Sequence, residues 1–233
     1  SIRGKSEVSV VGYKITPLKL GTIIRKKSNM IYHCGDDTPM TFPLISFLLE
    51  GNGHKVLVDT GGSVPDGQKW MPYARSEKEN LVEALRVHGV SPEEIDTVFF
   101  THLHWDHAGG NDSLVNARFF AQKKEYDYIK DEERPGFERD LVIQKSYQLL
   151  AGNVENVIEG VSVILTPGHS VGSQSIVVDS ENGMCVIAGN LFPTFYNVEH
   201  CIPNGGNYDV EIITDSMKKV LALGFPVLPG HEL

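Results

Sequence analysis

The sequence predicts an α/β protein in which strands and helices pack as a layered sandwich. Short apolar runs separated by turn residues fill the first quarter of the chain, and the second half mixes further runs of this kind with helical patterns. The chain has 233 residues, of which 41% are hydrophobic and 22% are charged. This length and composition suffice for a substantial core, and we expect a single domain over residues 1–233.

The first half of the chain predicts strands with one helix between them. Strands are expected at residues 8–11, 15–24, 44–49, 55–58 and 97–100. The stretch Gly51-Asn52-Gly53 is typical of a tight turn and joins the third of these strands to the fourth. A helix is predicted over residues 81–87, because apolar side chains recur there at helical spacing and Gly89 follows as a stop signal.

The second half predicts strands that alternate with helices. Strands are expected at residues 118–121, 161–165, 175–178, 184–188 and 226–228. Helices are expected at residues 123–129, 140–150 and 210–223. No internal repeat is visible, so a solenoid is not predicted.

Charge, hydropathy and cysteine content exclude several classes of partner. A formal net charge of −9 repels a phosphate backbone at long range, so we expect no nucleic acid substrate. No apolar run approaches the roughly 18 residues that span a bilayer, so we expect no membrane contact. Cys34, Cys185 and Cys201 have no CxxC spacing, which predicts neither a disulfide framework nor a cysteine zinc site and favours a cytoplasmic location.

The stretch THLHWDHAGG at residues 101–110 gathers metal-binding side chains directly after an apolar run. His102 and His104 face the same way in an extended segment, because side chains alternate there, so they can share one ion. Asp106 and His107 can bind a second ion nearby. Imidazole with carboxylate is a ligand set of zinc and also suits iron, manganese or nickel. The alternative interpretation is a histidine-rich surface loop without a ligand role.

Four segments taken together resemble one known family. HLHWDH at residues 102–107 matches the HxHxDH pattern of the metallo-β-lactamase superfamily, and LVDTG at residues 57–61 is similar to its LIDTG segment. TPGH at residues 166–169 and PGH at residues 229–231 match two further segments in the same order. The resemblance implies a four-layered αββα sandwich, in which two mixed β-sheets are flanked by helices.

The resemblance also implies a set of metal ligands. One ion would be held by His102, His104 and His169, and a second by Asp106, His107 and His231. Asp59 would orient a ligand imidazole and fix its tautomer, as metal sites generally require.

One position departs from the superfamily pattern. Where related two-metal enzymes have a bridging aspartate in the phrase AGD, this chain has Ala188-Gly189-Asn190. An amide oxygen can coordinate a metal, but it is neutral, so one negative charge between two dications is missing. Three interpretations stay open: a two-metal site in which Asn190 is a weak ligand, a one-metal enzyme, and a disabled site.

The function implied is hydrolysis. A bound divalent ion lowers the pKa of its water to about 7, which supplies hydroxide at neutral pH to attack a carbonyl. Among the families of this fold, the chain is most similar to the N-acyl homoserine lactone lactonases, which implies a lactone or related ester as the small-molecule substrate. The alternatives are a thioesterase or small-amide hydrolase, and a non-catalytic member that binds a metal or ligand, which Asn190 motivates. Monomer and homodimer both stay open.

Two residues are candidates for roles in the reaction itself. Asp106 would hold metal and accept a proton. The lactonases place a tyrosine three residues after the bridging aspartate, whereas Pro193 stands there in this chain, so we expect Tyr196 to substitute for it. Two long loops, residues 62–76 and 193–209, carry aromatic side chains that can form walls for an acyl group.

Overall fold

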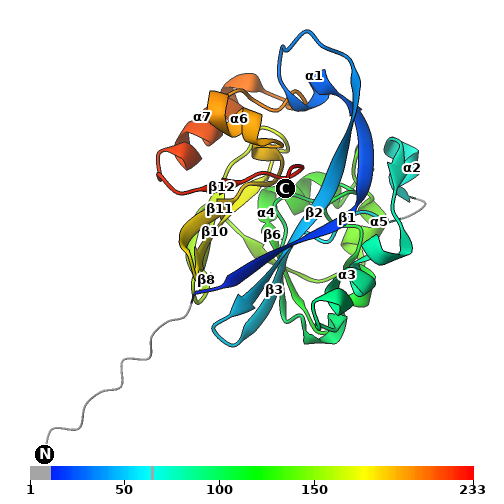
Figure 1. The fold of residues 1–233 in the computed structure, drawn as a ribbon, viewed down its shortest axis with the longest axis vertical. Helices are drawn as coiled ribbons and strands as arrows, with labels where there is room; N and C mark the ends of the chain where they lie inside the picture. The colour runs from blue at the N-terminus through cyan, green and yellow to red at the C-terminus, as the bar shows by residue number, and fades with distance from the viewer. Residues whose placement is uncertain (1–11, 64–65) are drawn as a thin grey trace, which may run out of the picture.

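The computed structural model describes residues 12–63 and 66–233, which form two β-sheets packed face to face with helices on both outer sides (Figure 1). The strands are β1 (Lys14–Lys26), β2 (Pro39–Gly51), β3 (His54–Val58), β4 (Tyr73–Ala74), β5 (Thr97–Phe99), β6 (Arg118–Gln122), β7 (Tyr147–Leu150), β8 (Val154–Ile158), β9 (Val161–Leu165), β10 (Gln174–Ser180), β11 (Gly183–Ile187) and β12 (Val227–Leu228). The α-helices are α1 (Lys27–Met30), α2 (Asp66–Trp70), α3 (Leu81–Val87), α4 (Lys123–Ile129), α5 (Arg139–Ile143), α6 (Phe195–His200) and α7 (Val210–Leu221).

Both sheets mix parallel and antiparallel pairs. The larger sheet has the strand order β4-β1-β2-β3-β5-β6-β7, and its β3, β5, β6 and β7 are paired in parallel. The smaller sheet has the order β12-β11-β10-β9-β8, with only β11 and β12 parallel. The predicted turn between β2 and β3 is present, and the positive φ angles of Asn52 (49°) and Gly53 (77°) match the hairpin turn that such a pair favours.

Three clusters of buried apolar side chains separate the four layers. One cluster lies between the two sheets and includes Phe47, Phe99 and Ile176. A second packs α3 against the larger sheet, and a third packs α7 against the smaller one. The predicted αββα sandwich is therefore confirmed. Within the part of the chain that the structure describes, no helix is long and apolar enough to cross a membrane.

Most predicted elements are present, and one is wrong. The expected strand at residues 8–11 lies outside the described residues. The expected helix at residues 140–150 is a short helix, α5, followed by the strand β7, which pairs in parallel with β6. The apolar residues of this segment fit either element, and pairing with the open edge of β6 decides in favour of a strand.

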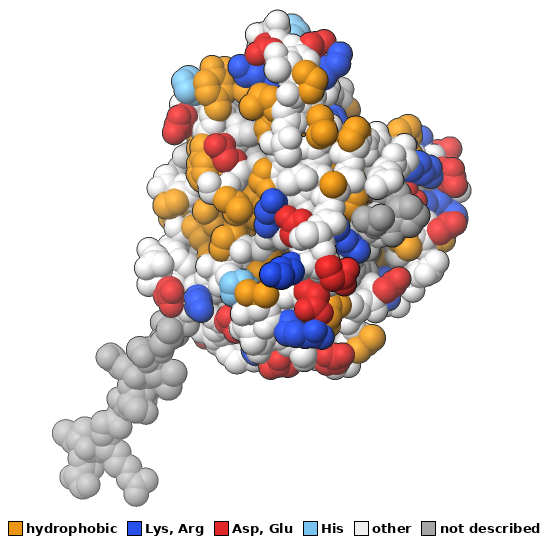
Figure 2. All heavy atoms as spheres, turned by 45° about the vertical axis from the view of Figure 1, so that its right-hand side comes forward, with side chains coloured by type: hydrophobic (Ala, Val, Ile, Leu, Met, Phe, Trp, Pro, Cys, Tyr) orange, Lys and Arg blue, Asp and Glu red, His pale blue; other side chains and the backbone are white. Residues whose placement is uncertain are grey.

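The charged side chains are dispersed over the face of the molecule that Figure 2 shows. Lysine and arginine side chains alternate there with aspartate and glutamate. This face offers no continuous basic stripe of the kind that binds a phosphate backbone.

Candidate metal centre and active site

The predicted metal-binding residues are brought together at one end of the two sheets. In the larger sheet, β3 and β5 run parallel, so the segments after them, which carry Asp59 and residues 102–107, emerge at the same edge. In the smaller sheet, His169 follows β9, while Asn190 and His231 follow the parallel strands β11 and β12. Residues from several strand ends therefore meet between the layers, a common place for an active site in α/β proteins.

The six residues form two adjacent groups. The first contains His102, His104 and His169, and the second contains Asp106, His107 and His231. Within each group, one potential ligand atom of every residue lies within 4.8 Å of the others. The groups touch, because the ring centroids of His102 and His107 are 4.1 Å apart. The structure thus places these side chains as the sequence predicts, in a geometry that can hold one or two ions.

Three buried polar atoms at this place have no hydrogen-bond partner among the described residues. They are Nε2 of His102, Nε2 of His107 and Oδ1 of Asn190. Leaving a buried polar atom unpaired costs about 1–3 kcal/mol, so such atoms are rare in proteins without a specific reason. A divalent cation that accepts these lone pairs supplies the reason. The donor set therefore fits a metal.

Asp59 connects the two segments behind the metal groups. Its Oδ1 accepts a hydrogen bond from the Thr101 backbone N–H at 2.7 Å, and its Oδ2 accepts from the Thr101 hydroxyl, also at 2.7 Å. The same Oδ2 lies 2.7 Å from Nδ1 of His107, which leaves Nε2 of that ring free for a metal. Asp59 adopts a φ of 62°, a left-handed conformation that non-glycine residues hold only when the surroundings enforce it. The predicted orienting contact is present.

Backbone carbonyls orient two further imidazoles. Nδ1 of His169 donates to the Gly206 carbonyl at 2.5 Å, and Nδ1 of His231 donates to the Pro43 carbonyl at 2.9 Å. Because a carbonyl can only accept, both rings carry their proton on Nδ1 and expose the lone pair of Nε2. This is the tautomer that a metal bound at Nε2 requires.

Burial sets the protonation states of the site. It lowers the pKa of His104 and of His231 to about 4, and lowers the pKa of His102 and of His169 well below the ordinary value. These four imidazoles are consequently neutral near pH 7, the form that binds metals.

Two members of the second group behave differently. Burial alone lowers the pKa of His107, but the charges of Asp106 and Asp59 outweigh it and raise the value. Burial also raises the pKa of Asp106, yet its interaction with the neighbouring imidazoles, His107 above all, brings the value below the ordinary one, so Asp106 stays a carboxylate.

Glu125, which no sequence motif identifies, joins the segments that carry the first group. Its side chain is fully buried, and its Oε1 accepts from the Leu103 N–H at 3.1 Å. Its Oε2 accepts from the Ser170 hydroxyl at 2.9 Å and from the Gly172 N–H at 2.8 Å. The signal available in the sequence is weak: Glu125 lies four residues before Ile129 on α4, and both face the interior.

A pocket of about 410 Å³ opens above the two groups. His104, Asp106, His169 and His231 line it on the metal side. Apolar side chains line another side: Ile23, Met30, Trp70, Met71 and Trp105. The expected wall formed by the first long loop is thus present.

The comparison with known protein families agrees with this geometry. The model of the Metallo-beta-lactamase superfamily matches residues 45–224. The chain belongs to the metallo-beta-lactamase superfamily. An N-acyl homoserine lactonase of Bacillus cereus is 30% identical over 213 residues, which is 83% of each chain.

Solved structures of other proteins share the fold. A crystal structure of a mutant of B. thuringiensis AiiA, with N-decanoyl-L-homoserine bound at its active site, is 24% identical. It covers 96% of this chain and 94% of its own with a TM-score of 0.85. The crystal structure of a quorum-quenching N-acyl homoserine lactone hydrolase is 25% identical and covers 96% and 93%, with a TM-score of 0.84.

The departure from the superfamily pattern at Asn190 has a clear place in the structure. The side chain is buried beside the first group, where its Nδ2 lies 3.2 Å from Nε2 of His169. Its Oδ1 is one of the three buried atoms without a hydrogen-bond partner. In this orientation, the amide presents an acceptor on only one side, whereas a carboxylate presents an oxygen to each side. Asn190 can therefore serve one ion at a time.

Tyr196 is not among the residues that line the pocket above the metal groups. It lies on α6, where its ring stacks on that of His200 at 4.1 Å, and it lines an adjacent pocket together with His231. Helix α6 begins at Phe195, two residues after Pro193. The tyrosine that lines the pocket is Tyr208, which sequence reasoning missed because it follows the Asn204-Gly205-Gly206-Asn207 turn and no motif identifies it.

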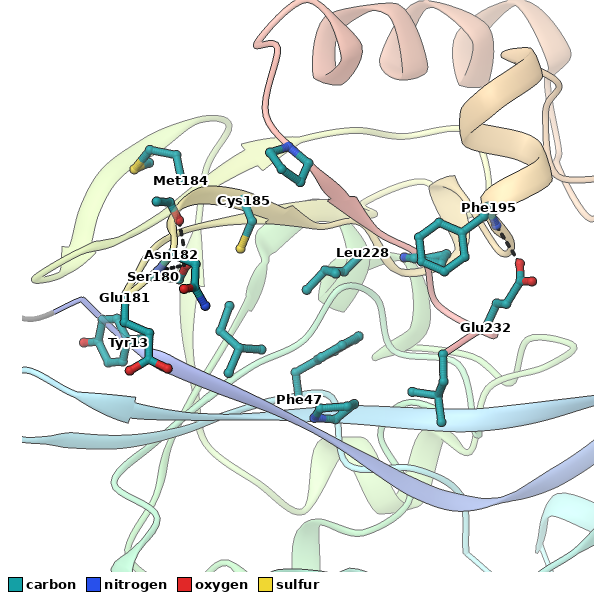
Figure 3. Close-up of a pocket in the computed structure, with 16 residues that line it drawn as sticks. Tyr13, Phe47, Ser180, Glu181, Asn182, Met184, Cys185, Phe195, Leu228 and Glu232 are labelled. Carbon is teal, nitrogen blue, oxygen red and sulfur yellow. Dashed lines mark hydrogen bonds between the residues drawn. The ribbon is translucent and has the colours of Figure 1, made fainter.

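A second pocket, of about 360 Å³, lies away from these groups between β1 and the β10–β11 hairpin (Figure 3). Phe47, Leu228 and Phe195 face into it. The second loop's aromatic residue Phe195 therefore lines this apolar pocket and not the one above the metal groups.

Proposed function

We propose that this protein is a metal-dependent hydrolase that opens the ring of an N-acyl homoserine lactone or a closely related ester. The observation that carries the proposal is the pair of ligand groups beneath a pocket with an apolar wall. The lactonase of B. cereus at 30% identity supports the substrate class.

The proposal assigns the ligands by group. His102, His104 and His169 hold one ion, and Asp106, His107 and His231 hold a second, with Asn190 as a one-sided ligand. Zinc is the first choice for such nitrogen-rich sets, and iron, manganese or nickel can also bind. When bound, a divalent ion supplies a nucleophile from water at neutral pH and polarises the substrate carbonyl.

The remaining steps fall to side chains of the pocket. Asp106 is a carboxylate that faces the pocket, so it can accept the proton that the attacking water gives up and return it to the alkoxide that leaves as the lactone ring opens. Tyr208 takes the role first expected of Tyr196, because its hydroxyl group can donate to the carbonyl oxygen. Trp70 and Met71 provide the apolar surface for the acyl chain.

The proposal extends to the setting of the protein. The three cysteines are free thiols, which supports a reducing compartment such as the cytoplasm. We place the enzyme there as a monomer or homodimer that acts on small molecules.

The test compares purified, zinc-supplemented protein with two alanine variants. His104→Ala should lose the ring-opening of N-acyl homoserine lactones together with part of the bound metal. His88→Ala, at an exposed histidine that caps the end of α3, serves as the control and should keep both. Folded, metal-loaded protein that hydrolyses thioesters but no lactone would replace the proposal with the thioesterase alternative. Turnover of neither class would favour a non-catalytic member.

A further inference from the structure

Asn204 is a buried amide at the wall of the pocket above the metal groups. Its side chain is 1% exposed and makes two hydrogen bonds to the backbone. Its Nδ2 donates to the Asn190 carbonyl at 2.9 Å, and its Oδ1 accepts from the Gly206 N–H at 2.8 Å. Because a carbonyl only accepts and an N–H only donates, these two partners fix the orientation of the amide.

Both hydrogen bonds lead to the imidazole of His169. The carbonyl of Gly206 accepts from Nδ1 of His169, and Nδ2 of Asn204 lies 3.3 Å from the same Nδ1. At the opposite edge of the ring, Nδ2 of Asn190 lies 3.2 Å from Nε2 of His169. Asn204 therefore holds, through their backbones, two residues that contact this proposed ligand.

The turn that carries Asn204 is anchored to α1. Gly205 packs so closely against this helix that a Cβ added to it would lie 1.8 Å from the Ser28 carbonyl oxygen. The N–H of Gly206 also donates to the Asn29 carbonyl at 2.9 Å. The amide of Asn204 thus connects a fixed segment of backbone to the first metal group.

Building on the proposed metal-dependent hydrolysis, we propose that Asn204 is a positioning residue that fixes the tautomer of His169 and the place of Asn190. A neutral amide is attracted to a cation less strongly than a carboxylate is. More of the affinity for the first ion therefore depends on ligands that are held in place before the ion binds. Asn204 supplies this order at the position where the chain departs from the superfamily pattern.

The first test observes the imidazole nitrogens of the metal-free protein by ¹⁵N NMR near pH 7, and the signals of His169 are assigned by their loss in His169→Gln. The unaltered protein should carry the proton of His169 on Nδ1. Asn204→Ala should show both tautomers. Asn204→Asp, which keeps an acceptor for the Gly206 N–H, should retain the proton on Nδ1.

The second test measures zinc affinity by competition with a chromophoric chelator. In a His107→Ala protein, where only the first group is intact, adding Asn204→Ala should weaken zinc binding by about 10- to 100-fold. In a His169→Ala protein, where only the second group is intact, the same addition should leave the affinity unchanged. Asn80→Ala, which removes the cap of α3 far from the metal groups, should leave both readouts unchanged and so serves as the control for a general loss of stability.

Three results would overturn the inference. They are an unaltered tautomer of His169 in Asn204→Ala, an unaltered zinc affinity in the His107→Ala protein, and an equal loss of affinity in both proteins, which would mean that Asn204 only stabilises the fold. If Asn204→Ala does not fold, Asn204→Ser takes its place in both tests. Neither test needs a substrate, so zinc-loaded protein that hydrolyses no lactone would refute the proposed function and leave the role of Asn204 open to the same measurements.

Discussion

Asp59→Asn tests whether the hydrogen bond behind His107 prepares that imidazole for a metal. The substitution keeps the shape of the side chain, and asparagine tolerates the left-handed φ of 62° as well as aspartate does. The backbone should therefore be unchanged. The change is confined to one negative charge and to one oxygen that becomes an N–H donor.

The structure allows two orientations of the new amide, and each leaves one contact unmet. If the oxygen faces the Thr101 N–H, the amide nitrogen faces Nδ1 of His107 and forces the proton onto Nε2, which then cannot bind a metal. If the oxygen faces His107, the amide nitrogen opposes the Thr101 N–H, which costs about 1–3 kcal/mol. Loss of such an orienting partner typically weakens metal binding by about 10- to 100-fold.

The assay is competition for zinc between the protein and a chromophoric chelator near neutral pH. The variant should bind at least one ion about 10-fold more weakly, whereas Asp215→Asn on the exposed surface of α7 should match the unaltered protein. Unchanged affinity for every bound ion in Asp59→Asn would refute the argument, because the tautomer of His107 would then be set by something else.

Three further predictions concern the same pocket. Asn190→Asp restores a carboxylate next to His169, so it should increase the affinity for the more weakly bound of two zinc ions. A metal titration in which the Asn190→Asp variant still binds only one ion would contradict this prediction. Tyr208→Phe should lower kcat by about 10-fold or more through loss of one hydrogen-bond donor to the oxyanion, while Tyr196→Phe should have little effect in the same assay. The metal-free protein should lose stability as pH falls from 6.5 towards 4, because His104 and His231 take up protons in the unfolded chain first. Urea denaturation of the metal-free protein across this pH range measures the change in the free energy of unfolding, and greater stability at the acidic end would contradict the prediction.

The sequence predicts the fold and the clustering of the six ligand residues for a local reason. His102, His104, Asp106 and His107 lie in one short segment, so their spacing is visible without knowledge of the fold. The partners from other strands, such as His169, are placed by the ordered phrases around them. Features that depend only on backbone direction and on short motifs can be predicted before the structure is known.

The parts that could not be predicted depend on contacts between distant segments. Glu125 becomes important only when α4 brings it against the segments of Leu103 and Gly172. Tyr196 lies six residues after Asn190 rather than three, and on helix α6 it does not line the pocket above the metal groups.

The charge of the site shows what the departure at Asn190 changes. In a two-metal centre of this fold, acids offset much of the charge of the cations, and here Asp106 and the more distant Asp59 are the acids beside the ligand imidazoles. An amide at position 190 leaves more of the cationic charge of two bound ions uncompensated than a carboxylate would. A second ion should therefore be held less tightly than the first, and Asn190→Asp should reduce that difference.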